Sequence, residues 1–368
     1  MKQLVRLKDI ATYSKGLQIN GDELVDRAEF DYLNGGINPS GKWNEANCVA
    51  NTITISEGGN SCGYVNFMTK PFWCGAHCYY LHNTIDNSRY LYYALKSQQE
   101  RIMKLRSGAC MPNIKKRDLG NFEFIFDYDV KEQEKVTLVL SKLENVIEAR
   151  KQELLALDNL IKARFVEMFG DVIHNDRKWE YKQFSDITTS RLGKMLDAKH
   201  QTGICKYPYL ANFNVQWFRF ELDNLNEMDF NEKDREEFCL EDGDLLVCEG
   251  GEIGRCAVWH NQVRKCFFQK ALHRVRCNQN IILPDYLSWW FKYNCENGGF
   301  AAIEGAKATI SHLTGAKMKM LDVTVPPIGL QEQFVDFINQ VNKSKAVVQE
   351  SLEETQLLFD SLMQKYFG

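Results

Sequence analysis

The clearest pattern in the chain is a stripe of apolar positions that occurs twice. Between Lys131 and Gly170, such positions recur at spacings of three and four, and the pattern returns between Gly329 and Gly368 at a constant offset of 198 residues. The first stripe comprises Val136, Leu140, Leu143, Ile147, Arg150, Leu154, Leu157, Ile161, Arg164 and Met168, and the second comprises Phe334, Ile338, Val341, Lys345, Val348, Leu352, Thr355, Phe359, Leu362 and Tyr366. Eight of ten positions in each stripe are apolar, and no proline or glycine interrupts either. Each segment therefore predicts one helix of about 35–39 residues, about 55 Å long.

The repetition extends weakly into the segments before each helix. The matching pairs are Leu7–Ile10 with Phe184–Ile187, Ser56–Gly59 with Cys248–Gly251, Tyr90-Leu91 with Tyr286-Leu287, and Ile114 with Ile310. Short alternating strands with Gly and Asn turns surround these markers. Residues 1–130 and 180–328 are therefore predicted to be two diverged copies of one α/β domain.

The predicted fold class is α+β, with two similar domains joined by two long helices. An apolar stripe must be buried, and the other copy supplies the partner, so we expect an antiparallel coiled coil with a pseudo-twofold internal repeat. The expected boundaries are 1–130 for the first domain, 131–170 for the first helix, 171–179 for a polar connector, 180–328 for the second domain and 329–368 for the second helix.

The composition is that of an ordinary globular protein. Of 368 residues, 44% are hydrophobic and 26% charged, which excludes a fibrous or wholly disordered chain. The apolar runs are far too short for a membrane span. Twelve scattered cysteines without paired spacing favour a reducing, cytoplasmic setting.

Two motifs suggest chemistry, but each has a simpler interpretation. Gly36–Trp43 follows phosphate-loop spacing until Trp43 replaces the Mg²⁺-binding hydroxyl, which favours a surface turn. Cys74, His77, Cys78 and His82 invite a zinc interpretation, although alternation along a strand explains them better than two separated ligand pairs. Nucleophile-elbow, dinucleotide and amino-methyltransferase motifs are absent from the sequence. We therefore expect neither intrinsic catalysis nor a metal site.

Net charge alone argues against a nucleic-acid partner, but its distribution does not. The net charge is −4, whereas DNA-binding surfaces are usually basic. However, residues 221–244 hold eleven acidic and two basic residues, and residues 254–276 hold six basic residues and no acid. Lys104, Arg106 and residues 115–117 form a comparable basic stretch in the first copy. Basic side chains in these stretches are suited to contact DNA phosphates. The alternative interpretation is that they are ordinary charges on a solvent-exposed strand face.

The architecture and several motifs resemble the specificity subunit of type I restriction-modification systems. The residues that carry the resemblance are Tyr32–Ile37, Pro39–Gly41, Ile55–Gly59, Gly63–Val65, Pro71–Cys74, Glu167–Gly170 and Gln364–Gly368. The resemblance covers essentially the whole chain. It implies a non-catalytic DNA-binding subunit in which each domain is a target-recognition domain for one half of a split, asymmetric DNA sequence.

The resemblance also implies partners and cofactors. The helices would dock two modification subunits that carry S-adenosylmethionine and methylate adenine, and a restriction subunit would add ATP- and Mg²⁺-dependent cleavage. No cofactor is expected in this chain itself. A spacer of about 55 Å limits the separation of the half-sites to roughly 16 base pairs, and recognition from one side of the duplex favours centres about 10 base pairs apart.

The DNA contacts are expected on the loops that differ between the copies. In the first domain the candidates are Asn34, Ser40, Lys42, Trp43, Asn44, Asn60, Ser61 and Lys70, with Arg106, Lys115 and Lys116 assigned to phosphates. In the second domain they are Arg191, Lys194, Asn212, Asn214, Trp217, Arg219, Arg255, Arg264, Lys265, Gln269 and Lys270. The alternative interpretation of each is a turn residue, a solvated charge or a packed aromatic ring.

Two other functional classes remain open from the sequence. One is a DNA adenine methyltransferase or nuclease acting alone, and the other is a coiled-coil scaffold that does not bind DNA. Incubating the purified protein with S-adenosylmethionine and DNA tests the first, and a gel shift with DNA tests the second.

Overall fold

The computed structural model describes residues 2–84, 87–108, 112–196, 203–301 and 312–368. The chain divides into two compact units, which we describe separately. Unit 1 comprises Met1–Glu153 with Val348–Gly368, and unit 2 comprises Leu154–Val347. The two long helices therefore contribute residues to both units.

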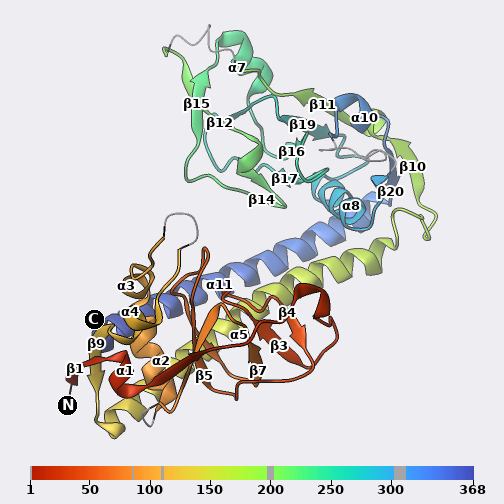
Figure 1. Cartoon of the computed structure of the whole chain (residues 1–368). Helices are drawn as coiled ribbons and strands as arrows, with labels where there is room; N and C mark the ends of the chain where they lie inside the picture. Colours follow the sequence, from red (N-terminus) through yellow and green to blue (C-terminus); the bar gives the residue numbers. More distant parts are fainter. Residues whose placement is uncertain (1, 85–86, 109–111, 197–202, 302–311) are drawn as a thin grey trace. The chain divides into compact units, whose positions relative to one another are not determined.

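Unit 1 contains three small sheets (Figure 1). A four-stranded antiparallel sheet has the order β2 (Thr12–Lys15), β8 (Cys78–His82), β5 (Thr52–Ser56), β6 (Val65–Met68). In a three-stranded sheet, β3 (Phe30–Leu33) pairs antiparallel with β4 (Gly41–Trp43) and parallel with β7 (Phe72–Cys74). A ribbon joins β1 (Lys2–Arg6) to β9 (Glu123–Asp127). The short helices are α1 (Leu7–Ile10), α2 (Ser88–Lys96), α3 (Gln99–Met103), α4 (Lys116–Gly120) and the 3₁₀ turn η1 (Gly21–Glu23).

Unit 2 repeats the three sheets of unit 1 with the same strand order and pairing. Its four-stranded sheet has the order β11 (Thr188–Leu192), β19 (Leu272–Cys277), β16 (Leu245–Cys248), β17 (Cys256–Val258). In its three-stranded sheet, β12 (Lys206–Leu210) pairs antiparallel with β15 (Asn226–Asp229) and parallel with β18 (Phe267–Phe268). The ribbon is β10 (Glu180–Gln183) with β20 (Asp322–Val325), and the corresponding helices are α6 (Phe184–Ile187), α8 (Pro284–Glu296) and α10 (Gly315–Lys319).

Three elements of unit 2 have no equivalent among the described elements of unit 1. They are the 3₁₀ turn η3 (Asn212–Asn214), the ribbon of β13 (Val215–Gln216) with β14 (Arg219–Phe220), and helix α7 (Glu232–Phe238). Helix α7 lies between β15 and β16 in the chain, where unit 1 connects β4 to β5 through residues 44–51 without a helix. The copies thus share their sheets and differ in their connections.

Backbone hydrogen bonds refine the sequence repeat. The amide of Ile114 donates to the carbonyl of Glu57, and in unit 2 the amide of Leu313 donates to that of Glu249. Leu313 is therefore the equivalent of Ile114. This corrects the proposed match with Ile310, which lies outside the described residues. The equivalence of Tyr90 with Tyr286 is confirmed, because both are buried near the start of a helix, in α2 and α8.

The two long helices are α5 (Val130–Phe169) and α11 (Ile328–Phe367), of 40 residues each. All ten stripe positions are buried or half-buried in both helices, as the spacing predicts. The antiparallel pairing is confirmed within each unit. In unit 1, Val136 and Leu140 from the beginning of α5 share a core with Met363 and Phe367 from the end of α11. In unit 2, the end of α5 shares a core with the beginning of α11.

Each long helix is joined to its sheet by the same buried side chain. Gln133 donates to the carbonyl of Asp127 at 2.6 Å, and Gln331 donates to that of Pro326 at 2.8 Å. The two glutamines are 1% and 0% exposed. Through these bonds the glutamine repeated in the sequence ties each helix to the end of its ribbon.

No described helix combines the length and apolar character needed to cross a membrane. Eleven of the twelve cysteines lie in the described ranges, and no disulfide bond joins any two of these eleven.

Candidate nucleic-acid interface

In unit 1, a glycine turn between β5 and β6 gathers part of the predicted site. The turn comprises residues 56–64 and is closed by a hydrogen bond from the Gly63 amide to the Ser56 carbonyl, at 2.8 Å. Gly63 has φ +88°, and a Cβ atom there would lie 2.7 Å from the Cα of Met103. Only glycine fits this position, which explains the spacing of the motif.

Polar contacts hold this turn against its neighbours. The hydroxyls of Ser56 and Ser61 both donate to the carbonyl of Gly35, in the latter case at 2.6 Å. The amide of Asn34 donates to Gln18 at 3.2 Å, and its oxygen accepts from the backbone of His77 at 3.1 Å. Asn34 and Ser61 therefore shape the loop, whereas Asn60 is exposed at its tip.

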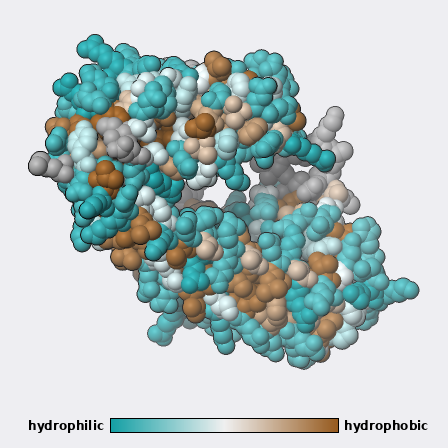
Figure 2. All heavy atoms as spheres, turned by 90° about the horizontal axis from the view of Figure 1, so that it is seen from below, coloured by the Kyte–Doolittle hydropathy of each residue, from teal (hydrophilic) through white to brown (hydrophobic). Residues whose placement is uncertain are grey.

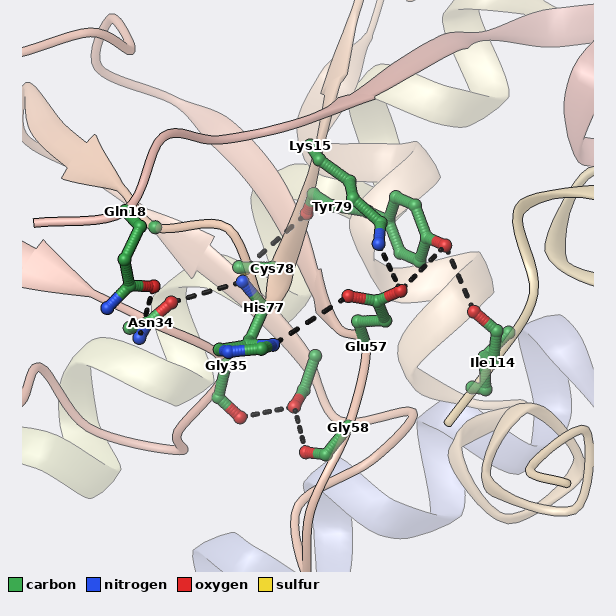
Figure 3. Close-up of polar contacts among 12 residues, drawn as sticks. Lys15, Gln18, Asn34, Gly35, Glu57, Gly58, His77, Cys78, Tyr79 and Ile114 are labelled. Atoms are coloured by element: carbon green, nitrogen blue, oxygen red, sulfur yellow. Dashed lines mark hydrogen bonds and ion pairs between the residues drawn. The ribbon is translucent and has the colours of Figure 1, made fainter. Parts of the chain in front are cut away.

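Glu57 is the polar centre of this turn (Figure 3). Its side chain is 12% exposed and forms an ion pair with Lys15, while the ring Nδ1 of His77 lies 4.0 Å from Oε2. The hydroxyl of Tyr79 donates to the Ile114 carbonyl at 3.0 Å and approaches Glu57 at 3.5 Å. Burial, and then the charge of Glu57, raises the pKa of Tyr79 well above its usual value. Glu57 is thus engaged by side chains of the surrounding strands and positions the loop.

The basic stretch of unit 1 lies beside this turn. Asn113 forms β-bridges with both Gly58 and Ser107. The Gly59 amide donates to the carbonyl of Pro112 at 3.1 Å. Arg106, Lys115 and Lys116 are exposed, and within the described parts of the chain no carboxylate pairs with them. The structure therefore brings Asn34, Asn60, Ser61 and these three cations together on neighbouring loops and the start of α4.

The remaining candidates of unit 1 belong to the three-stranded sheet. Ser40, Lys42, Trp43 and Asn44 lie on or beside β4, and Lys70 precedes β7. The Trp43 ring packs edge-on against Trp73 at 6.2 Å between centroids. Because residues 41–43 form a strand of a sheet, the segment from Gly36 is a turn followed by a strand and not a phosphate loop.

The four Cys and His residues considered for zinc have different surroundings in the fold. The thiols of Cys74 and Cys78 are buried and donate to backbone carbonyls, and His82 contacts the hydroxyl of Ser14 at 2.9 Å. The His77 side chain is exposed. Over the described ranges, no cluster of three or more such side chains is placed to hold a metal ion.

In unit 2, several predicted DNA contacts are engaged within the protein. Asn214 is 1% exposed, accepts from the Ala211 amide at 2.9 Å and donates to the Glu221 carbonyl at 2.9 Å. It holds a turn, so its assignment as a base contact is corrected. Arg255 is half-buried and donates to the Asn212 side chain at 2.6 Å, and Asn212 donates to Gly250 at 3.0 Å. These two side chains fix the loop equivalent to residues 56–64.

The acidic segment neutralises much of the basic charge of unit 2. Arg276 contacts Asp244 at 2.7 Å and Glu241 at 2.9 Å, and Arg274 donates to the carbonyl of Glu237 at 3.0 Å. Ion pairs also join Arg191 to Glu237, Lys194 to Asp234 and Arg219 to Glu221. Stretch 254–276 is therefore not the continuous basic surface that its sequence suggested.

Three of the cations predicted as DNA contacts in unit 2 remain available. Arg264, Lys265 and Lys270 are exposed, and none of the described carboxylates pairs with them. Gln269 is half-buried beside them, and its backbone bridges to Lys194. These residues flank β18 and form the basic edge of the three-stranded sheet of unit 2.

Trp217 belongs to a different feature, a cleft of about 620 Å³ within unit 2. Its walls are the β13–β14 ribbon, α8 and the adjoining parts of α5 and α11. Phe218 stacks on Trp289 at 4.4 Å, and the ammonium of Lys292 lies 4.5 Å from the Trp217 ring centre. Trp217 is thus packed beside a cation and is not on the loops that carry Arg264 and Lys270.

Comparison with known proteins identifies the family. A family model described as "Type I restriction modification DNA specificity domain" matches residues 2–158 and again residues 176–355. The chain belongs to this family. Its two matched segments coincide with the two topological repeats, so the type I specificity domain occurs twice.

Curated relatives support the assignment over part of the chain. A putative type I specificity subunit of Mycoplasma pneumoniae is 30% identical over 209 residues, which are 53% of this chain and 55% of that protein. A putative type I specificity subunit of Mycoplasma genitalium is 31% identical over 214 residues, again 53% of this chain and 54% of that protein. The chain thus matches about half the length of these relatives.

Solved structures share the fold. The crystal structure of a type I restriction-modification S subunit from M. genitalium has a TM-score of 0.67 and 20% identity, covering 100% of this chain and 96% of that chain. A chain from a structural study of complex assembly and conformational transition in the type I system has a TM-score of 0.57 and 12% identity, covering 99% and 97%. The specificity-domain architecture is therefore present over the whole chain.

Sequence reasoning missed the residues that support the first loop. Lys15, Glu57 and Tyr79 were not assigned a role at the site, and His77 was considered only as a metal ligand. The repeated Glu-Gly-Gly after a β-prone run was the available signal, since a carboxylate beside two glycines marks a constrained turn.

Proposed function

We propose that the chain is the DNA-recognition subunit of a type I restriction-modification complex, and that each unit binds one half of a bipartite DNA target. The observation that carries this proposal is the duplication of the specificity domain in segments 2–158 and 176–355. Two copies with the same sheets and different loops suit a target whose halves have different sequences.

In this proposal the loops around the glycine turns and the three-stranded sheets face DNA. Arg106, Lys115 and Lys116 in unit 1, and Arg264, Lys265 and Lys270 in unit 2, contact phosphates. Phosphate contacts set position and affinity, while base contacts such as one from Asn60 set sequence.

The long helices are proposed to bind two modification subunits, and a restriction subunit where the system has one. Both helices expose apolar side chains, including Leu138, Leu155, Val347, Leu357 and Leu358. Figure 2 shows hydrophilic residues over most of the face that it draws, with hydrophobic patches between them. Apolar side chains left in water on a structured helix are typical of a surface that a partner covers.

The chemistry is assigned to those partners. S-adenosylmethionine, ATP and Mg²⁺ would be bound by the modification and restriction subunits, and this chain would be non-catalytic. The complex would act in the cytoplasm, on cellular or incoming DNA.

Lengthening both helices tests the proposal. One heptad inserted in α5 after Glu153, and one in α11 after Val347, preserves the apolar stripe and adds about 10 Å. At about 3.4 Å per base pair, the unspecific gap between the half-sites should grow by about three base pairs. Selection of bound duplexes from a random library, with the native and lengthened chains, measures both the half-sites and the gap.

A matched control inserts the heptad in α11 alone, which puts the two stripes out of register and should abolish selective binding. An unchanged gap in the doubly lengthened chain would exclude the helices as a spacer. Absence of any sequence preference in the native chain would exclude DNA recognition itself.

A further inference from the structure

Two cations of unit 2 lie at the edge of its four-stranded sheet but are already paired. Arg191 is near the end of β11 and forms an ion pair with Glu237 of α7. Lys194 follows β11, and its ammonium lies 2.5 Å from a carboxylate oxygen of Asp234 and 2.7 Å from the Asp229 carbonyl. These four side chains line a surface cleft of about 660 Å³ between α7 and the end of β11.

Helix α7 is constructed so that both carboxylates face these cations. Asn231 and Asp234 form a reciprocal capping box at its start, which orients Asp234. Glu237 lies three residues later, on the same face of the helix. The Phe238 ring lies 5.8 Å from the Arg191 guanidinium, and the Phe230 ring 5.1 Å from the Lys194 ammonium. The aromatic rings hold the cations in place beside the acids.

Unit 1 contains neither half of this arrangement. Gly16 and Gly193 are equivalent, because their amides donate to Cys78 and Leu272 at the same point of the two sheets. By this register, Ser14 and Leu17 occupy the positions of Arg191 and Lys194. Helix α7 and its two cationic partners are therefore present together in unit 2 and replaced together in unit 1.

We propose that α7 is an internal mimic of the DNA backbone, whose carboxylates occupy Arg191 and Lys194 until phosphates displace them. This inference rests on the proposed function. The Arg191 and Glu237 side chains are 55% and 31% exposed, and an ion pair that keeps this much of its surface in water is weak, so a phosphate can replace the carboxylate. The Lys194 and Asp234 side chains are less exposed, at 19% and 17%, so Lys194 is the more firmly held of the two cations. Phosphate contacts are independent of sequence, so masking two cations lowers affinity for random DNA. The cognate duplex, held also by base contacts, still displaces the carboxylates.

Neutralising the two acids tests the mimic. The Glu237→Gln/Asp234→Asn variant keeps the size of both side chains and the capping acceptor at residue 234. Its affinity for a non-cognate duplex at low salt should rise about tenfold or more. The slope of log K against log salt should become steeper by about 1.8, since each additional phosphate contact contributes about 0.9.

The matched control is Glu232→Gln/Glu236→Gln, which removes the same charge from exposed positions of the same helix. It should leave the salt slope unchanged. Adding Arg191→Ala/Lys194→Ala to the test variant should cancel its gain. Glu237→Gln alone leaves the capping box intact and should give about half of the increase in slope.

Equal increases in DNA affinity and salt slope in the test and control variants would overturn the mimic. They would indicate that the acidic segment repels DNA only through its total negative charge. An unchanged slope in the test variant would also overturn the mimic. A native chain whose binding to duplex DNA is undetectable, or insensitive to salt, would instead refute the proposed function.

Discussion

The two units share a scaffold and differ in how they hold their charge. In unit 1, Arg106 on a loop and Lys115 and Lys116 at the start of α4 are exposed beside the glycine turn, without a described carboxylate partner. In unit 2, the acidic segment pairs with Arg191, Lys194 and Arg276, whereas Arg264, Lys265 and Lys270 stay exposed. Sheet order is maintained by the buried core, whereas surface charge has diverged with the inserted loops and helix α7.

The same contrast occurs inside the core, at one equivalent position. Tyr79 of β8 and His273 of β19 pair with Lys15 and Leu192 in equivalent registers. Tyr79 donates hydrogen bonds beside Glu57, while the Nε2 atom of His273 is buried without a hydrogen-bond partner among the described residues. At this equivalent backbone position, the pKa of Tyr79 is raised and the pKa of His273 is lowered.

The largest expected loss of stability comes from replacing a large buried side chain by alanine at equivalent positions of the two cores. Phe165 of α5 packs between Tyr286 and Phe334 in unit 2, and Met363, which is 198 residues later, is buried in unit 1. Phe165→Ala should lower the free energy of unfolding by about 3–5 kcal/mol and Met363→Ala by about 2–5 kcal/mol. Denaturant titration measures both. Hydrogen exchange should accelerate first around α8 for the former and around α2 for the latter, and uniform acceleration would contradict separate cores.

A smaller effect is expected from removing the exposed cations of one unit at a time. The triple variants Arg106→Ala/Lys115→Ala/Lys116→Ala and Arg264→Ala/Lys265→Ala/Lys270→Ala should each reduce the salt slope of duplex binding by about 2.7. The matched control replaces Lys142, Lys151 and Lys343, which are exposed on the long helices, and should change the slope little. If only one of the two test variants lost affinity, the units would not contribute equally to backbone binding.

The smallest effect concerns pH. Burial lowers the pKa of His273, against an opposing influence of Glu249. The unfolded chain takes up this proton near pH 6.5, so the folded state should lose stability as pH falls below that value. Unfolding measured at pH 7.5 and 5.5 should show a smaller pH-dependent loss for His273→Gln than for the native chain.

Tyr79 should act in the opposite direction. Because its pKa is raised in the fold, the unfolded tyrosine ionises first, near pH 10, and stability should fall above that pH. Tyr79→Phe removes this contribution, at the expense of the hydrogen bond to Ile114. An identical alkaline loss in the native protein and the variant would show that Tyr79 is not responsible.

Part of the site could be read from the sequence. The glycine turns follow from a motif that needs positive φ at fixed positions, and the exposed cations 106, 115 and 116 follow from their polar surroundings. The burial of Asn214 could not be predicted, because a polar side chain in a loop looks the same in sequence whether it faces solvent or holds a neighbouring carbonyl.

The duplication, the two long helices and their antiparallel pairing follow from the sequence alone, because a hydrophobic period is a local pattern that must be buried along its whole length. Which charges are free depends on the folded chain. An ion pair depends on distances between residues far apart in the chain, and Glu237 reaches Arg191 only after α7 has folded back beside β11. The number of cations is therefore fixed by the sequence, and their availability to DNA by the fold.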